Sequence, residues 1–401
     1  MEERKKLIEL WEQGMNVSEL HRRFGVSRPT VYATITRWLE SSCDQAALED
    51  RSRRPLSNSR QTDAATTAAL LNIKDLYPHW GPKKLVRLLE DEGIDLSVST
   101  ARDILSRNGR VKARRARPPR WSPMETPTIV IPGVGHTMSA DHKGQFRTGD
   151  RRYVYPLTLC DPASRYVFAV EALTSTGARP AWKVFERVFR EWGLPEQIVT
   201  DNGNPFCAAR AIGGLTELSK MWIKLGIQHV RIQPGRPQQN GSHERMHRTL
   251  KDEATHPAER NLKAQQGRFD RFQELFNHVR PHESLGQQRP ASRVQPYRRS
   301  YPRSIPAMEY PASFEVRRVR GKGMVKWRGE LVFVSEVLTD EMIGFARVDE
   351  DRWDLYFGHA RLAAWNDRLR RFERSDANTS KGRTPSSILP LKGEEEENGD
   401  V

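Results

Sequence analysis

Cysteine is scarce in this sequence, and it contains no long apolar run. Only Cys43, Cys160 and Cys207 occur, and their wide, odd-numbered spacing argues against a disulfide framework and suits a reducing compartment. No paired His/Cys spacing typical of a zinc module is present. No run approaches the roughly 20 apolar residues that cross a bilayer, and the amphipathic, acid-containing N-terminal segment does not look like a signal peptide. We therefore expect a soluble, cytoplasmic protein with no membrane partner.

Basic residues, in contrast, are abundant. The 401 residues include 66 Lys and Arg against 51 Asp and Glu, a formal net charge of +15. Such an excess favours a polyanionic partner, because clustered cations displace condensed counterions from phosphate. Charge alone does not separate DNA from RNA or from an anionic membrane. The length fits three or four domains.

Residues 1–50 have the pattern of a helix-turn-helix domain. Apolar residues recur at helical spacing in three segments, Gly14 and Gly25 end the first two, and Ser27 can cap the third. A similar pattern returns over residues 62–110, so we expect two tandem helix-turn-helix domains. Residues 110–128 have the composition of an extended basic linker.

Polar and basic side chains on the last helix of each unit are suited to base edges and phosphates in a major groove. In the first unit these are Arg28, Thr30, Tyr32, Thr34 and Arg37, in the second Thr100, Arg102 and Arg107, and in the linker Arg114, Arg115 and Arg117.

From about residue 129 the periodicity becomes that of an α/β domain, which we place at 129–300. The pattern predicts three short strands and then alternating helices and strands, a mixed sheet with flanking helices. The expected strands are 137–143, Tyr153–Cys160, 166–173, Gln197–Thr200 and 227–232, and the expected helices 181–192, 214–225, 240–255 and 266–279. Residues 313–366 are strand-rich and suggest a small β-barrel, and 367–401 have the composition of a disordered tail.

Three acidic residues stand where such a sheet would bring them together. Asp141 lies in the first strand, Asp201 ends the fourth in Thr-Asp-Asn-Gly, and Glu244 lies in the first turn of a helix opened by Gln-Asn-Gly-Ser-His. A carboxylate just past a strand's C-terminal end faces the ligand crevice of an α/β sheet. Converging carboxylates repel unless cations neutralise them, and Mg²⁺ suits such oxygen donors. Two ions roughly 3.5–4 Å apart can activate the attacking oxygen and stabilise the leaving one.

These residues resemble the DDE triad of retroviral-integrase-like transposases of bacterial insertion sequences. Lys251, seven positions after Glu244, matches the basic residue of that family's Glu-to-Lys/Arg signature and should share its helical face. The resemblance runs from the helix-turn-helix pair to the terminal strands. Two departures stand out: the 43 positions from Asp201 to Glu244 exceed the interval of the best-known members, with the extra length around 207–220, and the zinc-binding module of retroviral integrases is absent.

The resemblance implies an RNase H-like core and a polynucleotidyl transferase. Asp141, Asp201 and Glu244 would be both catalytic residues and ligands of two Mg²⁺ ions, for which Mn²⁺ could substitute. The enzyme would bind the terminal inverted repeats of a mobile element in double-stranded DNA, cut there, and join the 3′ end to target DNA. It would act on nucleoid DNA as a dimer or tetramer, with Lys251 and His247 as further DNA contacts.

Other interpretations of single residues remain open at this stage. Asp150 and Asp161 are rival first carboxylates, but Asp150 falls in a hairpin turn and Asp161 before Pro162, whereas Ala140 and the Lys143-Gly144 pair beside Asp141 match the family. His243 and His247 could suggest zinc, but a His next to a Glu on a helix does not share its face. Lys251 could be an ordinary surface lysine.

Two other functions compete with transposition. A catalytically silent DNA-binding regulator descended from a transposase would lack metal-dependent cleavage. A structure-selective nuclease would cut DNA without joining it. The presence of all three carboxylates counts against the regulator.

Overall fold

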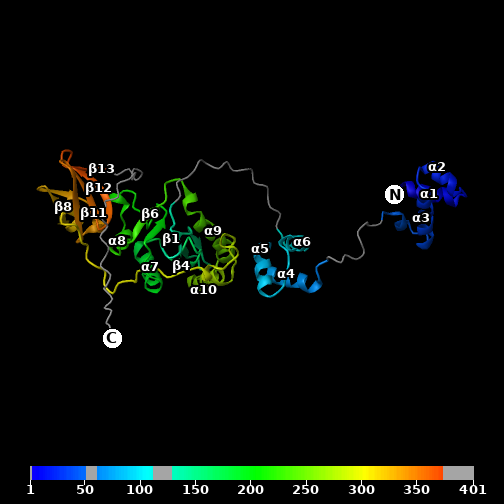
Figure 1. Cartoon of the computed structure of the whole chain (residues 1–401), viewed down its shortest axis with the longest axis horizontal. Helices are drawn as coiled ribbons and strands as arrows, with labels where there is room; N and C mark the ends of the chain where they lie inside the picture. The colour runs from blue at the N-terminus through cyan, green and yellow to red at the C-terminus, as the bar shows by residue number, and fades with distance from the viewer. Residues whose placement is uncertain (1, 51–60, 112–128, 374–401) are drawn as a thin grey trace, which may run out of the picture. The chain divides into compact units, whose positions relative to one another are not determined.

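A computed structural model of the chain describes residues 2–50, 61–111 and 129–373 (Figure 1). It divides into two compact units, Met1–Ala64 and Ala65–Val401. Within the described residues, no helix is both long and apolar enough to span a membrane.

The first unit is a bundle of three helices, as the sequence predicts. They are α1 (Glu2–Glu12), α2 (Val17–Phe24) and α3 (Arg28–Glu40), followed by a short 3₁₀ turn, η1 (Gln45–Leu48). Asn16 and Glu19 form a capping box at the start of α2, Gly25 ends it in the left-handed conformation, and the Ser27 hydroxyl caps α3. The core is apolar, with Leu7, Ile8, Leu20, Val31, Ile35 and Leu48 buried.

The second predicted helix-turn-helix also forms three helices around a core of its own. They are α4 (Ala64–Leu76), α5 (Pro82–Asp91) and α6 (Val98–Arg107), the last capped by Ser97. Trp80 links this group to the α/β domain. Its indole N–H donates to Glu253 at 3.2 Å, and the Arg280 guanidinium lies 5.2 Å from the centre of its ring.

The α/β domain is built on a six-stranded mixed sheet in the order β2-β3-β1-β5-β6, with β4 also paired to β3. The strands are β1 (Thr137–His142), β2 (Phe146–Arg147), β3 (Tyr153–Cys160), β4 (Val167–Leu173), β5 (Gln197–Thr200) and β6 (Gln228–Arg231). β1 runs antiparallel to β3 and parallel to β5, and β5 is parallel to β6. Mixed pairing of this kind is the RNase H-like arrangement predicted above.

Helices pack on both faces of this sheet. One face buries Met138, Ala140, Leu157 and Leu159 with residues of α7 (Ala178–Trp192) and α8 (Glu217–Lys224). The other face buries Val154, Cys160 and Val170 with residues of α9 (Gly241–Leu250) and α10 (Leu262–Glu274), each of which ends in a π-helical turn, Lys251–Thr255 and Leu275–Val279. Because side chains alternate along a strand, Ser139, Asp141 and Thr158 point to this second face.

The C-terminal strands form an open sheet, not the closed barrel expected from the sequence. Five strands pair antiparallel in the order β13-β12-β11-β10-β7, and β8 and β9 form a separate two-stranded sheet. Their bounds are β7 (Glu315–Arg318), β8 (Met324–Trp327), β9 (Glu330–Phe333), β10 (Met342–Asp349), β11 (Arg352–Phe357), β12 (Ala360–Asn366) and β13 (Arg371–Glu373). The sheet continues past the expected boundary at residue 366, because the ring of Phe372 packs on Trp365 and Asn366 donates to Glu373.

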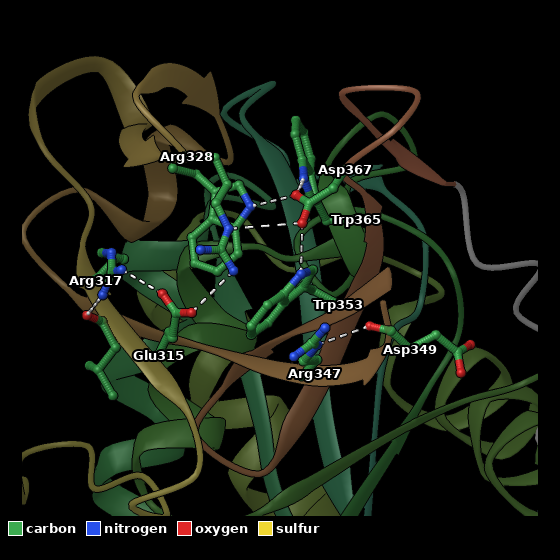
Figure 2. A network of polar contacts seen from close by, with 10 residues as sticks. Glu315, Arg317, Arg328, Arg347, Asp349, Trp353, Trp365 and Asp367 are labelled. Carbon is green, nitrogen blue, oxygen red and sulfur yellow. Dashed lines mark hydrogen bonds and ion pairs between the residues drawn. The ribbon is translucent and has the colours of Figure 1, made fainter. Parts of the chain in front are cut away.

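Three tryptophans of the C-terminal strands converge on one carboxylate (Figure 2). The indole N–H groups of Trp327, Trp353 and Trp365 donate to Asp367 at 3.3, 2.9 and 2.7 Å. The Arg328 guanidinium lies over two of these rings, 5.0 Å from the centre of Trp327 and 4.8 Å from that of Trp353, and pairs with Glu315 at 3.2 Å. Asp367 therefore ties β8, β11 and β12 together from one point.

The segment that lengthens the interval between Asp201 and Glu244 joins the two sheets. Leu215 and Ile223 are buried in the core of the C-terminal sheet, while Leu218 and Trp222 are buried in the core of the α/β domain. Lys224 pairs with Glu341 at 2.7 Å. This segment is therefore a bridge between two hydrophobic cores.

Candidate active site

Asp141 and Asp201 lie at the same edge of the sheet. The parallel pairing of β1 with β5 sets Ala140 opposite Thr200, so the next residue on each strand is one of the two aspartates. Asp201 lies at the start of a turn, where its Oδ1 accepts the backbone N–H of Gly203 at 3.0 Å. The strand order thus produces the pair of carboxylates that the sequence predicts.

Glu244 approaches from α9, which packs on the face to which Asp141 points. It lies one residue after His243, whose ring contacts β1 and β3, and its own side chain is exposed. Burial raises the pKa of Asp141 to about 7, with the charge of Asp201 the next cause and that of Glu244 a smaller one. Asp141 is therefore within electrostatic reach of both other carboxylates.

A hydrogen-bonded group of side chains lies beneath Asp141. The Thr158 Oγ1 is 2.6 Å from His243 Nε2 and 2.7 Å from His247 Nε2, and it donates to the backbone oxygen of Asp141 at 2.9 Å. Ser139 Oγ is 2.9 Å from His243 Nδ1. A hydroxyl has one hydrogen and two lone pairs, so these contacts assign Nε2–H to both imidazoles.

This group also decides how the two histidines are interpreted. Ligand atoms of Asp141, His243 and His247 all lie within 4.8 Å of one another, a grouping that could hold a metal ion. However, both Nε2 atoms donate to Thr158 and His243 Nδ1 lies 2.9 Å from the Ser139 hydroxyl, so of these four ring nitrogens only His247 Nδ1, 3.6 Å from Asp141 Oδ2, has no hydrogen bond within the described residues. Burial lowers the pKa of His243 to about 3 and that of His247 to about 2, so both rings are neutral. The arrangement supports Asp141 and does not favour zinc.

Two of the predicted DNA contacts are placed differently from expectation. His247 is only 6% exposed and contacts Thr158, because helix α9 turns it toward the sheet; its DNA contact stays a prediction. Thr34 is 7% exposed, and its hydroxyl donates to the backbone oxygen of Thr30, one turn earlier. Sequence reasoning compared each histidine with Glu244 and overlooked that residues 243 and 247, four apart, share a face.

The other predicted contacts in the described residues lie at least partly on the surface. Arg28, Thr30, Tyr32, Arg102, Arg107 and Lys251 are exposed, and Arg37 and Thr100 are half-buried. Arg114, Arg115 and Arg117 lie outside the described residues.

The rival carboxylates have structural roles. Asp150 accepts a hydrogen bond from the Thr148 hydroxyl at 2.5 Å within the hairpin turn. Asp161 accepts from the backbone N–H of Ala163 and the hydroxyl of Ser164, both at 2.8 Å, and so caps the turn after β3. Both findings agree with the turn roles expected for these residues.

Family comparisons cover the same parts of the chain. An integrase core domain matches residues 132–237, and a second integrase core domain family matches residues 225–290. Homeodomain-like domains match residues 1–47 and 30–105. The chain therefore has an integrase-like core, preceded by homeodomain-like domains. The matched core contains Asp141, Asp201 and Glu244.

Curated relatives of this integrase-like protein are retroviral polyproteins. It is 29% identical over 179 residues to the Gag-Pol polyprotein of Koala retrovirus, covering 44% of the chain and 10% of that polyprotein. It is 32% identical over 124 residues to the Gag-Pol polyprotein of Woolly monkey sarcoma virus, covering 31% of the chain and 7% of that polyprotein. It is 35% identical over 103 residues to the Pol polyprotein of Feline endogenous virus ECE1, covering 26% of the chain and 9% of that polyprotein. The integrase-like chain thus spans a tenth or less of these polyproteins.

Solved structures similar to the integrase-like protein include two from T-cell leukaemia and lymphotropic viruses. One is the HTLV-2 integrase catalytic core domain in complex with magnesium, at 15% identity and a TM-score of 0.32, covering 41% of this chain and 99% of that one. The other is a simian T-cell lymphotropic virus intasome in complex with a PP2A regulatory subunit, at 15% identity and a TM-score of 0.35. The match covers 73% of this chain and 97% of that one.

Proposed function

We propose that the protein is a transposase that binds the terminal inverted repeats of a mobile DNA element, cleaves the DNA there, and joins the freed 3′ end to target DNA. The observation that carries this proposal is the half-buried Asp141, next to Asp201 just past the end of the neighbouring strand and within electrostatic reach of Glu244. Three carboxylates held together in this way are unfavourable without a cation.

The donor set fits magnesium. Its members are carboxylates, the oxygen ligands that this hard ion prefers, and Asp141 is held close to its charged neighbours although burial disfavours its ionised form. Asp141, Asp201 and Glu244 would hold the metal, as two Mg²⁺ ions or Mn²⁺ in their place. When bound, the metal would supply charge stabilisation for the attacking and leaving oxygens of a phosphodiester.

The chain's own residues position this site and its DNA. Thr158 fixes the backbone of Asp141 and the ring of His247 at once, so the first carboxylate has little freedom to move. Lys251, exposed at the end of α9, would hold a phosphate of the element end. We propose that helices α3 and α6 read the ends, and that two or four copies assemble on them in the cytoplasm, on nucleoid DNA.

The decisive experiment compares wild type with Asp201→Asn on DNA carrying the sequences that flank the coding region. With Mg²⁺ present, the substitution should reduce cleavage and joining at least about a thousandfold, while end binding measured without metal stays within twofold. Asp150→Asn, which changes a turn carboxylate of the same domain, is the matched control. Equal joining by Asp201→Asn and wild type would refute the proposal. End binding with no cleavage by wild type would favour a silent regulator, and cleavage without joining would favour a nuclease.

A further inference from the structure

A cavity of about 470 Å³ lies beside α9 and the turn that follows β3. Arg165, Arg245 and His282 contribute polar groups to its lining, and Pro162, Met246 and Phe276 contribute apolar surface. The carboxylates of the candidate triad are not part of this lining. Its volume falls within the range of small-molecule sites, which span roughly 300–1,000 Å³.

Two arginines in this cavity have no anionic partner. Neither Arg165 nor Arg245 makes a side-chain hydrogen bond or an ion pair within residues 2–50, 61–111 and 129–373. Burial, and then the charge of Arg245, lower the pKa of Arg165, so the two guanidinium groups are close enough to repel each other. Like charges brought together at the wall of a cavity are expected where an anion binds between them.

Two acidic residues, Asp161 and Glu283, also line the cavity, and within the described residues neither forms an ion pair with these arginines; Glu283 pairs with Lys83. Asp161 attracts Arg165, but its oxygens already accept hydrogen bonds from Ala163 and Ser164 in the turn. It is 1% exposed, and burial raises its pKa. The charge of Asp161 therefore only partly offsets the two arginines.

One ring nitrogen of His282, at the same cavity, lacks a hydrogen-bond partner within the described residues. His282 Nε2 is buried and unsatisfied within the described part of the chain, and its ring packs edge-on against Phe276 with the ring centres 4.6 Å apart. Burial lowers its pKa to about 3, so the ring is neutral, and because the ring donates to the backbone of Phe276, Nε2 is left as a hydrogen-bond acceptor. An unsatisfied buried polar atom is rare in proteins and is explained by a ligand or water.

We propose that this cavity binds one nucleotide unit. Its phosphate would lie between Arg165 and Arg245, whose planar groups can each form paired hydrogen bonds to phosphate oxygens. Its sugar or base would lie against Pro162, Met246 and Phe276, with His282 Nε2 as a polar contact. The nucleotide could be free, or it could be an unpaired nucleotide of bound DNA, and only the second case rests on the proposed function.

Calorimetric titration of the full chain in metal-free buffer tests the site. Deoxyadenosine 5′-monophosphate should bind, inorganic phosphate should bind more weakly, and deoxyadenosine should show no measurable binding. Arg165→Gln and Arg245→Gln should each weaken nucleotide binding tenfold or more. Arg271→Gln, which removes an exposed arginine of α10 outside the cavity, is the matched control and should bind as wild type does. Unchanged affinity in both cavity variants, or no binding to wild type at millimolar nucleotide, would overturn the proposal.

A second arm identifies the source of the nucleotide. Binding of a blunt duplex is compared with that of the same duplex carrying a single-stranded overhang. If the cavity takes a nucleotide of DNA, the two variants lose the preference for the overhang; if it takes free nucleotide, they bind both duplexes as wild type does. Asp201→Asn should keep full nucleotide binding, so failure of the catalytic proposal and failure of this one give different results.

Discussion

The single hydroxyl of Thr158 forms hydrogen bonds with three groups. It donates to the backbone of Asp141 and accepts from His243 and His247. Thr158→Val keeps the shape of the side chain but leaves two buried imidazoles without their acceptor. Because an unsatisfied buried polar group costs roughly 1–3 kcal/mol, the free energy of unfolding should fall by at least about that amount. Denaturant unfolding measures it, with the exposed Thr174→Val as control.

The same substitution should also lower kcat, because Asp141 loses a contact that fixes its backbone. We expect a decrease of about tenfold or more in kcat for joining, with KM for DNA little changed, since Thr158 is fully buried and cannot touch DNA. A rise in KM with constant kcat would contradict this positioning role.

Asp141→Asn should stabilise the metal-free protein at pH 8. The carboxyl has a pKa of about 7 in the folded chain against 3.8 for the ordinary group. As the pH rises between these values, the unfolded chain loses this proton while the folded chain keeps it, so stability falls across that window and stays lower above it. The variant's unfolding temperature should therefore exceed that of wild type at pH 8, and the difference should shrink toward pH 4.

The same unfolding measurements with magnesium added should give the opposite order of stability. Magnesium should raise the unfolding temperature of wild type at pH 8 and leave Asp141→Asn nearly unchanged, because the variant lacks a metal ligand. Asp150→Asn is the control. The hydrogen bond from Thr148 lowers the pKa of Asp150, the opposite direction from Asp141, so replacing this carboxylate should not stabilise the protein. A variant less stable than wild type at pH 8 without metal would contradict the burial of Asp141.

At the scale of the elements, the Asp367 contacts hold the C-terminal sheet together. Asp367→Asn leaves one oxygen for three indole N–H groups and turns an amide donor toward them. Hydrogen bonds to a charged group contribute roughly 1.5–3 kcal/mol each, so a loss of at least about 2 kcal/mol in unfolding free energy is expected. Tryptophan fluorescence during denaturant unfolding reports it, and Asp351→Asn, at an exposed ion pair with Arg368, should change stability by less than about 1 kcal/mol.

Helices and strands with strong periodicity could be predicted from the sequence. Which elements pack against one another could be predicted only in part. The strand Gln197–Thr200 is observed with the predicted bounds, and the Ser27 cap of α3 is where the sequence places it. The pair of aspartates followed from strand order. The support beneath Asp141 did not, because it depends on which face of β3 meets α9, a tertiary contact that leaves no local pattern.

The expected barrel failed for a related reason. Alternating residues predict strands but not whether the last strand returns to the first, which depends on pairing between distant segments. In the described residues β8 and β9 form a separate two-stranded sheet, and β7 and β13 are the edges of the five-stranded sheet. The proposed triad depends instead on motifs that are local and whose order along the chain is specific.

At the scale of the whole molecule, DNA binding should depend on the first unit as well as on the catalytic domain. Arg28 and Tyr32 are exposed on α3. Arg28→Gln should weaken binding to element ends and reduce the slope of log affinity against log salt by about one, as expected when one phosphate contact is lost. Fluorescence anisotropy across a salt series measures this, and Lys6→Gln, an exposed lysine of α1, is the control. An unchanged slope and affinity would exclude Arg28 from the interface.

Neighbouring residues of α8 belong to different hydrophobic cores, since Trp222 is buried in one and Ile223 in the other. A shortened chain that stops before β7 would therefore bare Leu215 and Ile223 to water, and such apolar surface promotes self-association. Attempts to isolate the catalytic part by truncation should yield aggregates unless these two positions are made polar. The added length between the second and third carboxylates has made the C-terminal strands a structural requirement of the catalytic fold.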